Sequence, residues 1–278
     1  MAPRLAEMPS SVELLRTEDE LVERIREHDP ETWAERLGRF SGGLLAPLAG
    51  AVSRIRSARM FHPDGVVYRA SVVSIGATPE LARLGRRLEG TAIVRLSSAW
   101  WRGEKEWPDV LGMAIRFLRP GQHPNAKGLT DSQDLLLATI RFPWTMPFAP
   151  FTTRVSSFLW NHFHAVSPFE IDGIGRVKVR ARSPRIANVD GLPRAAHLAR
   201  EVRFHGAVYE LEIRRMDRRP LARSWEPLAR IVLEAPIAID QASLRFSAFR
   251  CGRGIRPVGY VHALRHATYA ASQDARSD

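Results

Sequence analysis

The sequence predicts an α+β protein whose core is about eight short antiparallel strands, arranged as a closed barrel or a sandwich. From residue 65 onward, apolar and polar residues alternate in short runs bounded by turn residues, a pattern typical of strands with one buried face. The number and spacing of these runs favour a barrel or sandwich. Hydrophobic residues make up 45% of the 278 residues, enough for a sizeable core. The eight predicted strands are 65–73, 90–98, 112–118, 134–142, 175–182, 204–215, 228–237 and 243–249.

Three other segments have helical patterns. In residues 11–56, apolar residues such as Val12 and Leu15 recur at intervals of three and four, and Pro30 predicts a break between two helices. We therefore expect a helical arm over residues 1–56 and one barrel domain over residues 57–278. Within that domain, helices are expected at 146–163, as an insertion, and at 257–276, near the end of the sequence.

Composition limits the classes of partner. The net charge is +11, and arginine supplies nearly all of the basic residues. The sequence lacks a recognition helix, a zinc module or an interleaved basic and aromatic face, so nucleic-acid binding is only a distant alternative. It also lacks an apolar run of the ~18 residues that a spanning helix needs, and it begins without a signal-like segment. We expect a cytoplasmic protein with neither a nucleic-acid nor a membrane partner.

The single cysteine, Cys251, excludes an intrachain disulfide and a cysteine-based metal cluster. Arg250 and Arg253 lie close in sequence and would favour a thiolate, but a buried small apolar residue is the preferred interpretation. His162 and His164 are expected at an interface or in solvent.

The segment RHATY near the end of the sequence places Arg265 and Tyr269 four residues apart, on one face of the predicted helix. A tyrosine ligates haem iron as its phenolate, and its usual pKa of ~10 must fall for that to happen. An adjacent guanidinium lowers a phenol pKa because it stabilises the charged form. The pair therefore indicates a candidate haem ligand.

With this pair, the chain resembles the monofunctional haem catalases and their smaller catalase-related peroxidases. The proximal motif of that family is Arg-x-x-x-Tyr followed seven residues later by arginine, and Arg265, Tyr269 and Arg276 have these spacings. The distal motif, Arg-x-x-His-x-x-Gly, is matched by RMFHPDG, with Arg59 and His62.

Two strands add to the resemblance. The family's Val-Arg-x-Ser segment is matched by VRLS, which contains Arg95 and Ser97 on one strand face. Residues 108–117 resemble the following strand of the family, without its arginine before the glycine. The family's distal asparagine falls at Asp134, with Gln133 beside it, so either residue could replace it.

The resemblance implies a catalase-like closed barrel that binds haem b. It implies Tyr269 as axial iron ligand, with Arg265 lowering the pKa of Tyr269. His62 is implied as the distal base, oriented by Ser97, and Asp134 as a distal polar group. The implied propionate ligands are the arginines at 59, 95 and 276.

The implied activity is that of a peroxidase, which reduces hydrogen peroxide or an organic hydroperoxide with an external reductant. Its partners would be those two small molecules, and a homodimer is left open. The sequence ends soon after the predicted proximal helix, without the further domain of full-length catalases, which favours an open site and peroxidase activity. Alternatives are true catalase activity, a hydroperoxide isomerase resembling allene oxide synthase, and a non-catalytic haem-binding protein.

Overall fold

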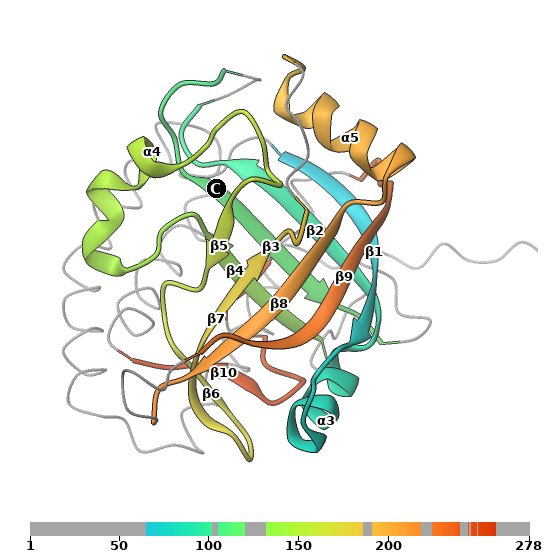
Figure 1. The fold of residues 1–278 in the computed structure, drawn as a ribbon, viewed down its shortest axis with the longest axis vertical. Coiled ribbons are helices and arrows are strands. Elements are labelled where there is room, and N and C mark those ends of the chain that lie inside the picture. Colours follow the sequence, from blue (N-terminus) through green and yellow to red (C-terminus); the bar gives the residue numbers. More distant parts are fainter. Residues whose placement is uncertain are drawn as a thin grey trace, which may run out of the picture.

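Eight antiparallel strands close a barrel in the described part of the chain (Figure 1). In the computed structural model, the described residues are 65–101, 105–119, 132–185, 191–217, 224–239, 244, 246–248 and 250–259. Going around the barrel, the strands are β1 (Gly65–Ser74), β2 (Gly90–Ser98), β3 (Leu111–Phe117), β4 (Gln133–Ala138), β5 (His162–His164), β7 (Gly175–Arg182), β8 (Val208–Arg215) and β9 (Glu226–Pro236). Because β9 also pairs with β1, no strand of this ring is an edge. The expectation of a closed barrel is confirmed.

Two short strands extend the sheet outside the ring. β6 (Phe169–Ile171) pairs with β7, and β10 (Ile255–Pro257) pairs with β6. The helix expected from residue 257 therefore does not start there, because Pro257 ends a strand. Any helix later in that segment, like the arm over residues 1–56, lies outside the described residues.

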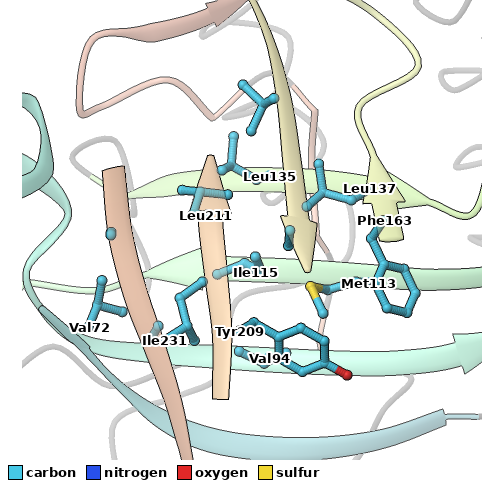
Figure 2. Close-up of a cluster of buried hydrophobic side chains, with 14 of the residues drawn as sticks. Val72, Val94, Met113, Ile115, Leu135, Leu137, Phe163, Tyr209, Leu211 and Ile231 are labelled. Carbon is cyan, nitrogen blue, oxygen red and sulfur yellow. The ribbon is translucent and has the colours of Figure 1, made fainter. Parts of the chain in front are cut away.

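The barrel interior is a continuous apolar core. Every second residue of each strand points inward, and Figure 2 shows these side chains meeting from opposite walls. Val94, Ile115 and Leu135 come from three neighbouring strands, and Leu211 comes from the far wall. Tyr209 is also fully buried, and burial raises the pKa of its phenol. The interior is a packed core, so a ligand site has to lie on the outer surface.

Two helices pack against the barrel core: Leu84 and Leu88 of the first and Leu198 of the second belong to the same buried cluster as the inward-pointing strand side chains. In α3 (Pro79–Leu88), the side chain of Thr78 accepts a hydrogen bond from the backbone N–H of Leu81, and Pro79 occupies the first turn, both typical of a helix start. The second is α5 (Arg194–Phe204). Sequence periodicity did not predict either helix. Among the described residues, no helix is long and apolar enough to cross a bilayer.

The prediction of a helix over residues 146–163 is wrong for most of its length. The structure has a 3₁₀ turn, η2 (Pro143–Phe148), one turn of α-helix, α4 (Ala149–Thr152), and then irregular chain up to β5. Proline at 147 and 150 removes backbone donors that a longer helix requires. The hydroxyl of Thr153 also donates to the carbonyl of Ala149 at 2.8 Å, which helps to end the helix.

The strand predicted over residues 243–249 is also wrong for its described residues, which form no strand. The barrel is already closed by the pairing of β7 with β8, so this segment has no edge to join. It crosses the outer face of the sheet instead. There Leu244 and Phe246 pack with Val67 and Ile93 of β1 and β2.

Candidate functional site

The outer face of β1–β4 contains a strip of unusually small side chains. In an antiparallel sheet, directly opposed residues point to the same face. The register aligns Gly65 with Ser97, Ser97 with Gly112, and Gly112 with Ala138. Since Leu96 and Met113 point into the barrel, this first row points outward. Across four strands, no side chain of this row is larger than serine.

The second row aligns Val67, Arg95, Ala114 and Leu136. Arg95 is 4% exposed, although it points away from the barrel core. Its guanidinium carbon lies 3.0 Å from the position that a Cβ on Gly65 would occupy, so the guanidinium folds over the first row. We call the outward-facing residues Gly65, Ser97, Gly112, Ala114 and Ala138 the small-residue floor.

The third row aligns Arg69, Ile93, Arg116 and Asp134. Arg116 and Asp134 form a buried ion pair: Nε donates to Oδ1 at 2.9 Å and Nη2 donates to Oδ2 at 2.8 Å. The backbone N–H of Ser247 also donates to Oδ2, at 2.8 Å, and the Phe246 ring lies 4.9 Å from the guanidinium carbon. The carboxylate of Asp134 thus fastens the 244–248 segment to the barrel.

Of the two candidates for the distal polar group, only Asp134 lies on the outward face. Gln133 has the opposite parity on β4 and donates through Nε2 to the carbonyl oxygen of Arg250 at 2.9 Å. Asp134 in turn lies four residues before Ala138, about 13 Å along the strand from the first row. Both side chains already have protein partners. A role for Asp134 or Gln133 in orienting peroxide stays a prediction.

Two segments border the floor. Ala149 of α4 and Val166 pack beside Ala138 at one end, and Phe246 covers the other. A separate cavity of about 10 Å³ is lined by residues that include Leu136, Ser167 and Asp134. That volume is room for about one water molecule. The described residues therefore supply one wall of a site, and any opposite wall has to come from elsewhere in the chain.

The structure brings together two of the predicted site residues. Arg95 and Ser97 lie in adjacent rows on the same face, both 4% exposed. Asp134 lies on the same face in the third row, and the remaining predicted residues, His62 and those at 59, 265, 269 and 276, lie outside the described residues. Gly65, the last residue of the predicted distal motif, is directly opposite Ser97.

The side chains of the floor are of the kinds that a haem site requires. Glycine, alanine and serine let a planar macrocycle approach the sheet closely, and a buried guanidinium beside them is a suitable partner for a carboxylate. Among the described residues, no group of three histidine, cysteine or acidic side chains could hold a metal ion.

Cys251 does not supply a reactive thiol to this site. Burial raises the pKa of its thiol to about 12, although Arg256 acts in the opposite direction. At neutral pH the sulfur is a thiol, which is a weak nucleophile. The preferred sequence interpretation, a small apolar residue, agrees with this environment.

The outer face of β5, β7 and β8 has charged side chains that pair with one another. Glu212 accepts hydrogen bonds from Arg180 and Arg182, and Arg182 also pairs with Glu210 at 3.0 Å. The ring of His164 lies 6.1 Å from that of Trp225. The pKa of His164 is lowered to about 3, first by burial and then by the positive charges around it. We call these six residues the paired-charge face.

No protein-family model matches the sequence, and no curated protein is similar to it. The fold is similar to that of a solved structure, the crystal structure of a fungal catalase at 1.9 Å, with a TM-score of 0.52 and 11% sequence identity. The match covers 76% of this chain and 57% of the fungal chain, so the chain spans little more than half the length of that catalase. The barrel is therefore catalase-like in fold.

Proposed function

We propose that the protein is a haem-b-dependent peroxidase that reduces hydrogen peroxide or organic hydroperoxides with an external reductant. One observation supports this above the others: the small-residue floor, with buried Arg95 and Ser97, lies on the outside of a catalase-like barrel. The motif that resembles the catalase distal segment ends at Gly65, in the first row of that floor.

In this proposal, Tyr269 would ligate the iron and Arg265 would favour its phenolate form by opposite charge. The redox chemistry that cleaves the peroxide O–O bond would be supplied by the haem. Arg95 would bind a haem propionate, together with the arginines at 59 and 276, through charge-assisted hydrogen bonds. Arg95 is suited to this because its buried guanidinium lies over the edge of the floor.

His62 would take the proton from the bound hydroperoxide and return it to the leaving oxygen. Ser97 would orient the His62 ring with a hydrogen bond, which requires the ring to lie above the first row. Overall, one hydroperoxide takes two electrons and two protons and yields one alcohol, or water, and one water. The two electrons come from the external reductant.

Replacing the axial ligand and the distal base tests the proposal. We expect the purified parent, reconstituted with haem, to show a ferric tyrosinate absorption spectrum. Tyr269→Phe should lose that spectrum, and His62→Ala should keep it while slowing reaction with cumene hydroperoxide by ~10²–10⁴-fold. Measuring oxygen evolution separates catalase activity from peroxidase activity.

Two outcomes would contradict the assignment. If Tyr269→Phe binds haem with the spectrum of the parent, Tyr269 is not the ligand. If His62→Ala reacts with peroxide as fast as the parent, His62 is not the base and only haem binding survives.

A further inference from the structure

The segment formed by η2 and α4 exposes large apolar side chains and buries small ones. Its exposed residues are Trp144, Met146, Phe148 and Phe151, with exposed fractions of 72%, 47%, 66% and 77%. We call these four residues the aromatic patch. The buried residues of α4 are Ala149, which packs with Val110 and Val166, and Pro150.

This arrangement is the reverse of an ordinary surface helix, which points its large apolar side chains at the core. Trp144, Phe148 and Phe151 lie within eight residues of one short exposed segment of the chain. Trp144 is further held by stacking on Phe142, with ring centroids 4.7 Å apart. Figure 1 shows α4 at the margin of the ribbon, outside the barrel wall. A patch of this kind marks an interaction surface.

The charge around the patch favours an anionic partner. No acidic residue occurs between Asp134 and Glu170. Arginine flanks the patch on both sides: Arg141 lies over the Phe142 ring at 5.3 Å, and Arg154 lies over the Trp160 ring at 4.5 Å. Both arginines are exposed. A second copy of the chain is a poorer partner, because it would bring like charges together and each copy has a net charge of +11.

We propose that the aromatic patch docks the protein on the surface of an anionic phospholipid bilayer. Tryptophan and phenylalanine insert at the boundary between headgroups and acyl chains, and flanking arginines bind the negative headgroups. This docking is peripheral and needs no spanning helix. The absence of a long apolar run in the sequence predicted no membrane partner, and the aromatic patch becomes evident only from the exposure of its side chains. The proposal is independent of haem binding.

Vesicle binding by the full-length chain tests the proposal. Sedimentation with vesicles of phosphatidylglycerol and phosphatidylcholine should pull down the protein, and vesicles of phosphatidylcholine alone should bind it more weakly. The triple variant Trp144→Ser, Phe148→Ser, Phe151→Ser should lower the partition coefficient by about tenfold or more. Raising NaCl from about 0.1 to 0.5 M should also weaken binding, because salt screens the arginines.

Phe204→Ser is the matched control, since Phe204 is 65% exposed at the end of α5, outside the patch. It should bind vesicles like the parent, and circular dichroism should show that both variants are folded. Equal vesicle binding by the parent and the triple variant would overturn the proposal. The proposal would also be overturned if the parent did not bind vesicles but formed a dimer, and the triple variant did not dimerise. The aromatic patch would then bind a second copy of the chain.

Discussion

Two outer faces of the barrel each contain an arginine paired with an acidic residue, but one pair is buried and the other is partly exposed. On β3 and β4, Arg116 and Asp134 pair across neighbouring strands with side-chain exposures of 2% and 0%. On β7 and β8, Arg182 and Glu210 pair in the same way, with exposures of 33% and 12%. The strands do not cause this difference. The first pair is buried because the 244–248 segment crosses it, which shows that burial on this barrel is decided by the connecting chain.

The contrast has a consequence for function. A covered face excludes water and strengthens electrostatic interactions, so a cation such as Arg95 can there bind a carboxylate tightly. On the paired-charge face, Arg182 and Glu210 are partly solvated, so electrostatic interactions there are weaker. The floor on β1–β4 is therefore the better place for a charged ligand, in agreement with the proposed function.

The largest expected effect comes from breaking the buried pair. We expect Arg116→Ala to lower the free energy of unfolding by about 3–5 kcal/mol, because it leaves the Asp134 carboxylate buried without its main partner. Urea unfolding of the haem-free protein measures this loss. The double variant Arg116→Met, Asp134→Leu should recover much of it, since it removes both charges. If the single variant unfolds like the parent, the carboxylate is not buried as described.

The sequence predicted the barrel strands well, but it predicted poorly the helices and connecting segments that pack on the barrel. The predicted β2 and β7 match the observed bounds, because alternation reports directly on the two faces of a strand. The start of α3 had a readable signal in Thr78 and Pro79 that periodicity alone did not use. No sequence signal predicted the pairing of Arg116 with Asp134, because this pairing depends on the register between two strands, with the residues 18 positions apart.

The same limit applies to the site. The motif containing Arg95 and Ser97 indicated both residues, and their shared face followed from strand geometry. The small-residue floor could not be found in this way. Its glycines and alanines are ordinary in four separate strands, and they form a patch only after the register aligns them.

The paired-charge face should respond to acid through His164. Burial and nearby positive charges lower the pKa of His164 to about 3, from a usual value of 6.5. Between those values the unfolded chain binds a proton that the folded chain does not, so stability is lost as the pH falls from 6.5 toward 3. The expected slope is about 1 kcal/mol per pH unit, below the limit of ~1.4 because the ring is partly exposed.

Urea unfolding at several pH values, compared between the parent and His164→Gln, measures this slope. The variant should lose stability less steeply over that range. His205→Gln, which changes an exposed histidine after α5, should keep the slope of the parent. An unchanged slope in His164→Gln would show that His164 is not the group responsible.

A side chain added to the floor should weaken haem binding. Gly112 lies between Ser97 and Ala138 in the first row, so Gly112→Val places a branched side chain where a planar group would lie. We expect about tenfold weaker haem affinity, the size of a typical overpacking cost. Haem titration followed by absorbance measures it. Thr91→Val, an exposed change on β2 beyond the floor, is the control; equal affinity in both variants would contradict the floor as the binding wall.

The smallest effect is expected for Arg182→Gln on the paired-charge face. Arg182 is a third exposed, and Glu212 keeps Arg180 as a partner when Arg182 is replaced. No carboxylate is left buried and unpaired, so the loss in the free energy of unfolding should be below about 1 kcal/mol. It should shrink further in about 1 M NaCl, which screens exposed pairs but not buried ones. Urea unfolding of Arg182→Gln and Arg116→Ala, each at low salt and in about 1 M NaCl, compares the two faces directly. A salt-insensitive loss above about 2 kcal/mol for Arg182→Gln would show that this face, too, is covered.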